Sequence, residues 1–445
     1  MLALFDVFDH AARELLQSLA TAGIDVTPVV IQYEGELPEG GLSPFVTYTG
    51  IEREGDPLFF DEVPVPAWCE IRQGREVYGE ILRDGSAIAR INYEPNSFRQ
   101  VESVDWLLPD RTLGHTDHYD RYGNHYATTH YSNGVGYQTV YQGPRGTVEL
   151  HHASRIVTLR TPHRLLTFDT LADFVSHLID DQRLDDGRVL TNSLSHPLFV
   201  TRKRARQPNT TLFWQEPMRG DVPGNMATEL EQPRALERIV FFDEPLRQKV
   251  AGRYPETTLD LTYLSHIGQF ADKPDYDPRR AFTLTNSDQL PVLVELLEAF
   301  PDVTFSVAAL TLMSERLHAL ARAYPNLTLT PTINHTKIAE ELARASVYLD
   351  INAGAHVLDV VPAAYYLNLV VLAVAPLAKA PDYSRVCATT DELKAQLATA
   401  IASPDGRARA LDALHTQHGP LSTPEDYQRL WHETRPSSTA TLPIA

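Results

Sequence analysis

The sequence predicts an α/β protein with two domains, each built on a mainly parallel sheet, and an antiparallel sheet inserted into the first. Its 445 residues are too many for one ordinary hydrophobic core. From residue 281 onward, short apolar runs alternate with helix-length segments, which is typical of a doubly wound parallel sheet. Between residues 56 and 168 the hydrophobic period changes to two, which is typical of antiparallel strands. Helical periodicity returns at Leu171, so the first domain is expected to resume after the insert.

These changes of pattern set the expected domain boundaries. The first domain is predicted to comprise residues 1–55 and 169–254, with the inserted meander at residues 56–168. The second domain is predicted at residues 255–412. A C-terminal helix and a disordered, Pro-containing tail are expected at residues 413–445.

The first domain is expected to begin with a strand, a helix and a second strand. Apolar residues run from Leu2 to Phe8, the segment His10–Ala22 has one apolar helical face, and a second strand is predicted at Val26–Tyr33. After the insert a helix is expected at Leu171–Leu178. Further strands are then expected at Val189–Leu190, Leu198–Val200, Thr211–Trp214 and Arg238–Phe242.

The insert is expected to form a meander of eight to ten strands. Alternating runs such as Glu76–Leu82 and Ala87–Tyr93 are separated by turn signals such as Asp84-Gly85. Its histidines are interpreted as exposed sheet positions, because their spacing along strands does not identify a metal site. Its tyrosines leave two interpretations open, an aromatic face that binds a partner or packing on the neighbouring domain. These tyrosines are Tyr119, Tyr122, Tyr126, Tyr131, Tyr137 and Tyr141.

The second domain has the most regular alternation in the chain. Its expected strands are Ala281–Leu284, Thr304–Ala308, Leu327–Leu329, Val347–Ile351, Leu369–Val374 and Arg385–Cys387. Its expected helices are Leu290–Phe300, Ser314–Ala323, Thr336–Ala345, Leu358–Tyr366 and Asp391–Ile401. A final helix is expected at Glu425–His432, packed on the first domain.

The composition excludes several classes of protein. A formal net charge of −19 repels phosphate backbones, so nucleic acid is not expected as a partner. The two distant cysteines, Cys69 and Cys387, exclude a disulfide framework and a cysteine zinc site, which fits a reducing cytosol. The N-terminus lacks a basic n-region, and no apolar run approaches the roughly 20 residues of a membrane span. A cytoplasmic location is therefore expected, with any membrane contact peripheral, at the inner face of the membrane.

One basic run, Arg202-Lys203-Arg204-Ala205-Arg206, is conspicuous in this acidic chain. A solvated loop is the expected structure for such a run. A contact with phosphate or anionic lipid is the alternative.

Polar residues of the second domain follow two of its predicted strands. The stretch Tyr348–Ala373 is predicted to form a strand, a turn, a helix and a second strand, and the loop after Leu284 precedes Pro291. In an open α/β sheet, the loops at the carboxyl ends of the strands line the ligand crevice. A helix N-cap at Ser287 or Asp288 also explains the second of these loops. The residues predicted here to bind a ligand are Asn286, Ser287, Asp288, Gln289, Asn352 and Gly354.

The first domain has a second group of polar residues directly after predicted strands. A tryptophan with amide, hydroxyl and carboxylate neighbours supplies the flat apolar face and the hydrogen bonds that a sugar or polar peptide needs. The residues predicted to bind are Asn192, Ser193, Trp214, Gln215, Glu216 and Asn225. The alternative stays open that Trp214 is core, Glu216 an ordinary loop acid and Pro223–Met226 a plain turn. His196 beside Ser195 does not indicate a hydrolase, because the chain lacks a G-x-S-x-G turn there.

Several motifs along the chain together resemble one family. They are an N-terminal L-F-D before a helix, N-S-L-S-x-P-x-F-V from Asn192, L-F-W-Q-E-P from Leu212, P-G-N-M from Pro223, L-T-N-S-D-Q from Leu284 and Y-L-D-I-N from Tyr348. In this combination the chain resembles the GtfB family, the stabilising, non-catalytic subunits of the O-GlcNAc transferases that glycosylate serine-rich repeat adhesins of Gram-positive bacteria.

The resemblance implies a GT-B-like arrangement of two Rossmann-like domains facing a cleft, with the meander in the first domain as the partner-binding part. It implies a hetero-oligomer with a catalytic subunit, GtfA, which uses UDP-GlcNAc. It also implies binding of the Ser/Thr-rich adhesin acceptor before export by the accessory Sec system. The polar residues of both domains then become acceptor- or sugar-binding residues, and no catalytic residue, cofactor or metal is expected in this chain.

A comparison with donor-using glycosyltransferases of this architecture supports the absence of catalysis. In those enzymes the strand-turn-helix unit of the second domain carries two glutamates spaced E-x7-E that hold the donor sugar, and this chain has Ala355 and Ala363 at the matching positions. A cation that would clamp the diphosphate is also not found near Asn286–Gln289. Two alternatives remain, an active retaining glycosyltransferase with a UDP-sugar donor and another two-domain enzyme such as a nucleotide-sugar epimerase.

Overall fold

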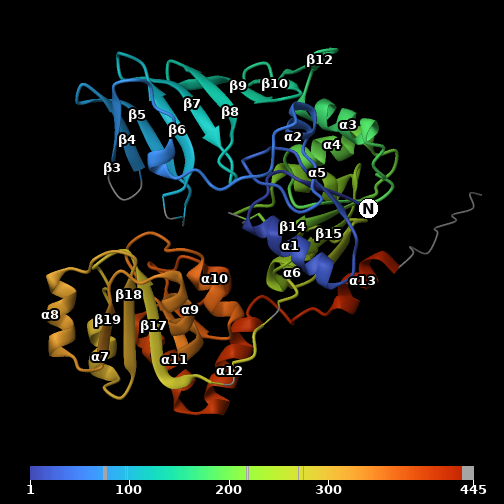
Figure 1. The fold of residues 1–445 in the computed structure, drawn as a ribbon. Helices are drawn as coiled ribbons and strands as arrows, with labels where there is room; N and C mark the ends of the chain where they lie inside the picture. Colours follow the sequence, from blue (N-terminus) through green and yellow to red (C-terminus); the bar gives the residue numbers. More distant parts are fainter. Residues whose placement is uncertain are drawn as a thin grey trace, which may run out of the picture. The chain divides into compact units, whose positions relative to one another are not determined.

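A computed structural model describes residues 1–73, 78–95, 97, 99–216, 218, 220–268, 270–273 and 275–432 (Figure 1). The chain divides into two compact units. Unit 1 comprises Met1–Ile267 and Leu421–Ala445, and unit 2 comprises Gly268–Pro420. The start of the strand expected from Glu76, Pro217 of the L-F-W-Q-E-P motif and the tail after residue 432 lie outside the described residues.

Unit 1 contains a six-stranded parallel sheet in the described part of the chain, with the order β16-β15-β14-β13-β1-β2. After β2 the chain leaves this sheet, forms the insert, and returns to place β13 on the other side of β1. The strand order therefore reverses between β1 and β13, and the loops after these two strands begin side by side. The strands are β1 Leu2–Phe5, β2 Thr27–Val30, β13 Val189–Thr191, β14 Thr210–Trp214, β15 Leu236–Phe241 and β16 Asp260–Tyr263.

The helices expected in unit 1 from the hydrophobic periodicity are present, but one expected strand is replaced by a helix. The strand expected at Leu198–Val200 is wrong, because this segment lies in a helix that begins at His196. A three-residue apolar run fits either structure, and Pro197 in the first turn favours the helix because its missing N–H is not needed there. The helices are α1 His10–Thr21, α2 Pro44–Thr49, α3 Leu171–Asp181, α4 His196–Arg204, α5 Gly224–Glu231, α6 Glu244–Arg253 and α13 Pro424–His432.

The boundary between the units differs from the one expected after residue 254. Strand β16 follows that position and pairs with β15, so the first sheet extends beyond Tyr254. Strand β16 has only four residues, Asp260-Leu-Thr-Tyr, and is too short and too polar to be recognised as a strand in the sequence. The C-terminal helix α13 returns to unit 1, where Tyr427 is fully buried and donates its hydroxyl hydrogen bond to the carbonyl of Ser265 at 2.9 Å.

The insert forms an antiparallel sheet of ten described strands in which each strand pairs with the next along the chain. Two of its tyrosines, Tyr126 and Tyr141, join the core of the first α/β domain, where Tyr141 stacks on Phe45 of α2. Tyr137, in contrast, is exposed. Packing on the neighbouring domain therefore accounts for part of the tyrosine pattern. The strands are β3 Cys69–Gln73, β4 Tyr78–Arg83, β5 Ser86–Tyr93, β6 Val101–Leu107, β7 Leu113–Tyr119, β8 His125–Ser132, β9 Val135–Gly143, β10 Gly146–His151, β11 Val157–Arg160 and β12 Leu165–Phe168.

Unit 2 is built on a second parallel sheet, with the order β19-β18-β17-β20-β21-β22 among the described residues. The order reverses between β17 and β20, which brings the loops after these strands together. Apolar clusters lie on the two faces of this sheet. Its strands are β17 Asp277–Thr285, β18 Thr304–Ala309, β19 Leu327–Thr330, β20 Ala345–Asp350, β21 Val370–Val374 and β22 Arg385–Cys387. Its helices are α7 Leu293–Ala299, α8 Glu315–Ala323, α9 His335–Arg344, α10 Val360–Tyr366, α11 Thr390–Ala402 and α12 Pro404–His415.

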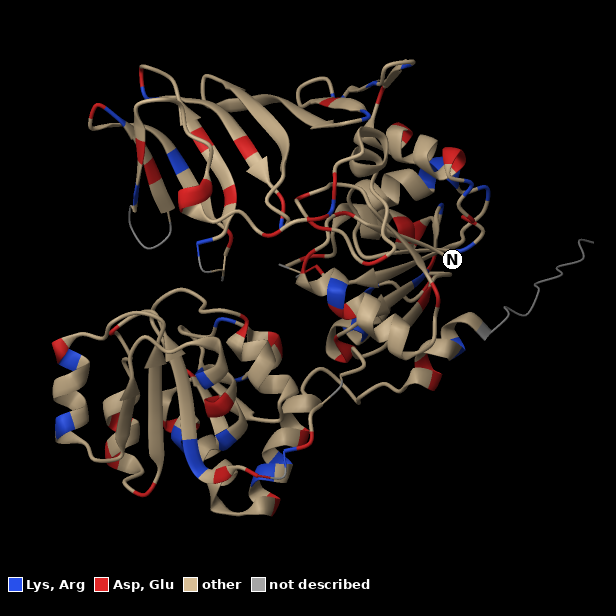
Figure 2. Ribbon diagram, viewed as in Figure 1, with Lys and Arg blue, Asp and Glu red and all other residues tan. Residues whose placement is uncertain are grey.

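Basic residues are interspersed with acidic ones over both units (Figure 2). A protein that follows a phosphate backbone instead gathers its lysines and arginines into a stripe or patch.

Candidate functional site

Polar side chains gather at the carboxyl edge of the first sheet, where its strand order reverses. We call this group the first-domain polar site. Asp6 follows β1, Gln32 follows β2, Asn192 and Ser193 follow β13, and Gln215 and Glu216 follow β14. Its members are Asp6, Gln32, Asn192, Ser193, Ser195, His196, Gln215 and Glu216.

Hydrogen bonds within the site hold the loops after β13 and β14 together. The Asn192 amide donates to Oε1 of Gln215 at 3.3 Å, and the Ser193 hydroxyl donates to Oε1 of Glu216 at 2.7 Å. Gln215 in turn donates to the carbonyl of Ala11 in α1 at 2.7 Å. The buried Oδ1 of Asn192 has no hydrogen-bond partner among the described residues. Asn192, Ser193, Gln215 and Glu216 thus lie together, as their positions after neighbouring strands predicted, and their role in binding stays a prediction.

His196 and Ser195 do not form a catalytic triad with Asp6. Nδ1 of His196 lies 3.0 Å from Oδ1 of Asp6 and 3.3 Å from Oγ of Ser195. A triad requires the acid and the nucleophile on opposite nitrogens of the imidazole, so that a proton taken at one is balanced at the other. Here both partners compete for the same nitrogen, and the site cannot activate Ser195 in that way.

The first-domain polar site is acidic, because it contains the carboxylates of Asp6 and Glu216, and Glu34 lies within electrostatic range of Asp6. Burial raises the pKa of Glu34, and the nearby carboxylates of Asp6, Glu102 and Asp9 raise it further. Such an environment opposes a phosphate and favours a neutral, hydrogen-bonding ligand.

The prediction that Trp214 binds a ligand is corrected by the structure. Its side chain is only 3% exposed and packs among Leu198, Met226 and Leu230, so the ring has no free face for a sugar. The pattern was ambiguous because a tryptophan at a strand end fits either a core or a binding surface. Core packing, the alternative considered from the sequence, is what the structure shows.

Asn225 lies at the start of α5 and fastens the turn before it to the loop after β13. Its amide donates to the carbonyl of Leu194 at 3.1 Å. Further along α5, Glu229 is fully buried and accepts hydrogen bonds from Arg202 of α4 and from three backbone N–H groups that precede or begin β15. The P-G-N-M turn is therefore part of a fixed framework, and Asn225 acts on the site by positioning Leu194.

The second-domain polar site lies where the order of the second sheet reverses. Its members follow β17 and β20, and all six predicted residues lie in these two loops: Asn286, Ser287, Asp288, Gln289, Asn352 and Gly354. The loop after β17 is closed by Thr285, whose hydroxyl group accepts the N–H of Ser287 at 3.0 Å. Ala353 joins the loops, because its N–H donates to the carbonyl of Gln289 at 3.0 Å.

Asn352 is the centre of this site but has no hydrogen-bonding capacity left for a ligand. Its Oδ1 accepts from Thr285 at 2.9 Å and from the N–H of Gly354 at 2.8 Å. Its Nδ2 donates to Oδ1 of Asn286 and to the carbonyl of Ala355, both at 3.1 Å. A side-chain amide has two donors and two acceptor positions, and all four are used. The prediction that Asn352 contacts a ligand is therefore corrected to a positioning role, which leaves exposed Asn286, Asp288 and Gln289 as the available groups.

Gly354 is required by the close approach of the two loops. A Cβ at this position would overlap Oδ1 of Asn286 and lie 3.0 Å from Oδ1 of Asn352. We expect Gly354→Ala to displace Asn286 and to weaken binding of any ligand that Asn286 contacts by about tenfold, the loss of one or two hydrogen bonds. The measurement is the affinity for a Ser/Thr-rich peptide by calorimetry, with the exposed neighbour Ala355→Ser as the matched control. Equal affinities in Gly354→Ala and the control would contradict this assignment.

Lys379 is a cation of the second-domain polar site that the sequence prediction missed. Its ammonium donates to the carbonyls of Asn352 at 2.6 Å and Leu377 at 2.5 Å, and its backbone N–H donates to Oδ2 of Asp350 at 2.6 Å. Burial raises the pKa of Asp350, and these interactions with Lys379 and the nearby His356 oppose that rise. Lys379 follows β21, far along the chain from Asn286, so no local motif indicated it.

The comparisons with known proteins now decide the family. Models of the GtfB N-terminal, middle and third domains match residues 2–48, 69–169 and 171–251, and the GftB/GlyA-F C-terminal domain matches residues 281–413. The chain is 32% identical over 381 residues to the UDP-N-acetylglucosamine--peptide N-acetylglucosaminyltransferase stabilizing protein GtfB of Streptococcus pneumoniae, covering 84% of each chain.

The chain belongs to the GtfB family.

A second member, from Limosilactobacillus reuteri, is 30% identical and also covers 84% of each chain. Among solved structures, this GtfB-family chain matches one from the GtfA/B complex bound to UDP and GlcNAc, with a TM-score of 0.88, 28% identity and coverage of 97% and 99%. The pneumococcal O-GlcNAc transferase GtfA shares the fold alone, with a TM-score of 0.54, 10% identity and 97% of each chain covered. The predicted GT-B-like fold class, with an antiparallel sheet inserted in the first domain, is confirmed.

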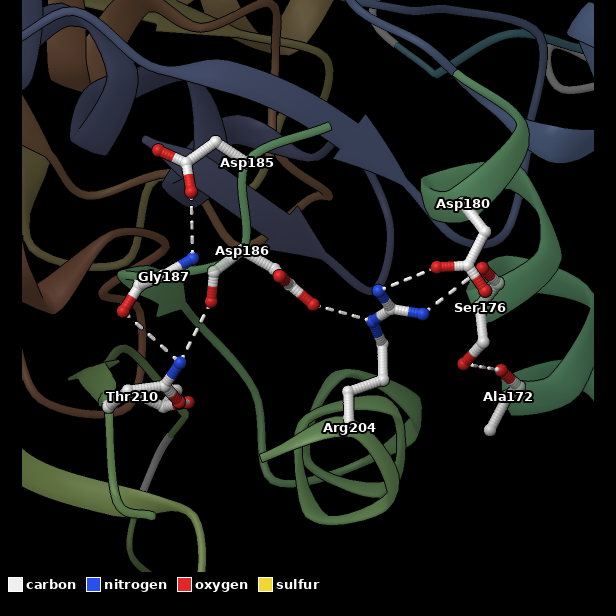
Figure 3. Close-up of polar contacts among 9 residues, drawn as sticks. Ala172, Ser176, Asp180, Asp185, Asp186, Gly187, Arg204 and Thr210 are labelled. Atoms are coloured by element: carbon white, nitrogen blue, oxygen red, sulfur yellow. Dashed lines mark hydrogen bonds and ion pairs between the residues drawn. The ribbon is translucent and has the colours of Figure 1, made fainter. Parts of the chain in front are cut away.

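The basic run of this GtfB-family chain is largely neutralised by acids of its own unit, and most of it is helical rather than a loop. Arg202 pairs with Glu229, and Lys203 with Asp173. Arg204 bonds Asp186 at 2.8 Å and Asp180 at 2.9 Å (Figure 3). Arg206 has no ion pair in the described part of the chain. A phosphate or lipid contact by the whole run therefore lacks support.

No group of three or more His, Cys, Asp or Glu side chains among the described residues has the arrangement of a metal site. No helix described by the structure combines the length and the apolar character needed to cross a membrane.

Proposed function

We propose that this chain is the non-catalytic, stabilising subunit of a protein O-GlcNAc transferase complex, and that it binds a Ser/Thr-rich adhesin acceptor while a catalytic GtfA subunit transfers the sugar. Membership of the GtfB family supports the role, as does the likeness to a chain of the GtfA/B complex. The complex would act in the cytoplasm, peripherally at the inner face of the membrane, before export by the accessory Sec system.

The observation that carries the proposal is the chemistry of the second-domain polar site. It offers the exposed side chains of Asn286, Asp288 and Gln289, with the ammonium of Lys379 beside Asn352, whereas the positions that would hold two donor-binding glutamates are Ala355 and Ala363. Removing one preorganised group from such a site typically costs about 10²–10³ in rate. Groups of this kind suit hydrogen bonding to hydroxyl-rich polypeptide or to its first sugars.

The alternative, an active retaining glycosyltransferase, draws support from Lys379 beside Asn352. Two carbonyls already accept hydrogen bonds from its ammonium, which leaves one N–H for a phosphate. We expect the purified chain alone, given UDP-GlcNAc and an acceptor peptide, to release no UDP above background. The same assay with GtfA added should glycosylate the peptide. UDP release by the chain alone, abolished in Lys379→Met, would establish the alternative.

We further propose that the insert binds GtfA through its distal rim, defined as Trp68, Leu108, Val135 and Tyr137. Six of the ten large apolar side chains exposed among the described residues lie in the insert, these four with Phe59 and Leu165. The turns at the other end of the sheet contact the α/β domain, as when Arg145 N–H donates to the carbonyl of Thr49 at 2.8 Å. Trp68 is 93% exposed and has a φ of 64°, a strained backbone for a bulky residue.

Charges placed on the distal rim should therefore disrupt the complex. We expect Val135→Asp with Trp68→Glu to weaken association with GtfA by at least about thirtyfold, the effect of removing a binding hot spot. Biolayer interferometry with immobilised GtfA measures this. The control is Leu312→Asp, an exposed leucine of unit 2 that is 84% exposed. An undiminished affinity in the double variant would exclude the rim.

A further inference from the structure

A cavity of about 380 Å³ opens in unit 1 at the end of the first sheet opposite the first-domain polar site. It lies beside the beginnings of β1 and β13, next to the loop that precedes β14. Aliphatic side chains that are at most 4% exposed form its floor. This floor comprises Leu2, Leu4, Ile179, Val189 and Val200. Polar side chains line most of the rest of the cavity, and its volume is large enough for a small organic molecule.

Arg204 lines one side of the cavity, and three hydrogen bonds fix its guanidinium. Its Nε and Nη2 donate to Asp186 and Asp180, and its Nη1 donates to the carbonyl of Ser176 in α3 at 3.3 Å (Figure 3). Asn209 closes the adjacent loop, because its amide donates to the carbonyls of Asp186 and Gly187 at 2.8 and 3.3 Å. The rim of the cavity is thus built before any ligand arrives.

Three polar groups on this rim make no hydrogen bond or ion pair with the described residues. One is the second carboxylate oxygen of Asp186, because only Oδ2 receives the Arg204 hydrogen bond. The others are the side chains of Arg206 and Gln207, which line the cavity and have no hydrogen bond or ion pair among the described residues. Helix α4 also ends here, and the C-terminal carbonyls of a helix favour a positive charge.

We propose that this cavity binds a small zwitterion with an apolar body, namely an apolar α-amino acid. The carboxylate of the ligand pairs with Arg206, its ammonium with Asp186 and the end of α4, and its side chain covers the aliphatic floor. An α-amino acid carries a carboxylate and an ammonium on the same carbon, and the rim presents one cation without an ion pair, Arg206, and one carboxylate with a free oxygen, Asp186. The assignment is independent of acceptor binding and of the catalytic partner.

The test is titration of the full chain with L-leucine and L-phenylalanine, followed by saturation-transfer NMR and calorimetry. Matched ligands separate the three parts of the recognition: N-acetyl-L-leucine lacks the ammonium, L-leucinamide lacks the carboxylate, and glycine lacks the apolar body. We expect saturable binding of the two amino acids, and at least about tenfold weaker binding of the other three compounds.

Variants identify the site. Arg206→Ala should weaken L-leucine binding by about tenfold without changing the thermal midpoint, because Arg206 makes no contact that stabilises the fold. Ala205→Phe should block the cavity, and Arg253→Ala, an exposed arginine of α6, is the matched control. The proposal is overturned if neither amino acid binds, if N-acetyl-L-leucine or L-leucinamide binds as well as L-leucine, or if Arg206→Ala and Arg253→Ala behave alike.

Discussion

Replacing Trp214 by alanine is expected to lower the free energy of unfolding by about 3–5 kcal/mol, the usual cost of truncating a buried tryptophan. The side chain is 3% exposed and belongs to the cluster beneath α4 and α5. Truncation leaves a cavity in this cluster, which also contains Leu198, Met226 and Leu230. Urea denaturation followed by far-ultraviolet circular dichroism measures the change in unfolding midpoint.

A conservative variant separates stability from binding. Trp214→Phe keeps most of the apolar volume and removes a buried indole Nε1 that has no hydrogen-bond partner among the described residues, so it should cost clearly less than Trp214→Ala. Both variants, measured under conditions where they are folded, should bind acceptor peptide with unchanged affinity. A weakened acceptor affinity with an unchanged unfolding midpoint would instead restore Trp214 as a binding residue.

Trp214 also illustrates what local sequence patterns can and cannot predict. The parallel sheet of unit 2 was predictable because its central strands are buried on both faces, so runs such as Val370–Val374 are continuously apolar. The positions of the polar sites were predictable because loops at the carboxyl ends of strands meet where the strand order reverses. The role of each side chain within those sites was not predictable, because it depends on burial and on hydrogen-bond partners that are distant in the chain.

Asn352 and Lys379 are the clearest examples. A short sequence motif gives Asn352 the chemistry of a ligand contact, yet its four hydrogen bonds are all made within the protein, to the β17 loop and to its own turn. Lys379 reaches the same site from the loop after β21, which only the strand order places beside β20. Helix α4 was mispredicted for a different reason, because the three-residue run Leu198–Val200 fits a strand and a helix equally well.

Replacing Glu229 by glutamine is expected to cost about 3 kcal/mol at neutral pH, because it breaks the ion pair and hydrogen bonds of a fully buried carboxylate. Oε2 accepts the N–H groups of Arg234, Ala235 and Leu236 at 3.0–3.1 Å, and Oε1 accepts Nε of Arg202 at 2.7 Å. Glutamine supplies one oxygen and an NH₂ group. The NH₂ group would face either the guanidinium or the backbone N–H groups, so buried donors would lose their acceptor.

The same network makes the contribution of Glu229 depend on pH with a definite sign. Burial alone would raise its pKa, but the N–H groups of Arg234, Leu236 and Ala235 and the guanidinium of Arg202 outweigh burial and lower it. A carboxyl with a lowered pKa stabilises the fold fully above its unfolded-state value of about 4.3, and this contribution is lost as the pH falls through the lower folded-state value. Urea unfolding from pH 7 to pH 3 should therefore show a shallower acid dependence in Glu229→Gln than in the wild type. Glu231→Gln, an exposed position of the same helix, should keep the wild-type slope, and equal slopes in all three proteins would contradict the assignment.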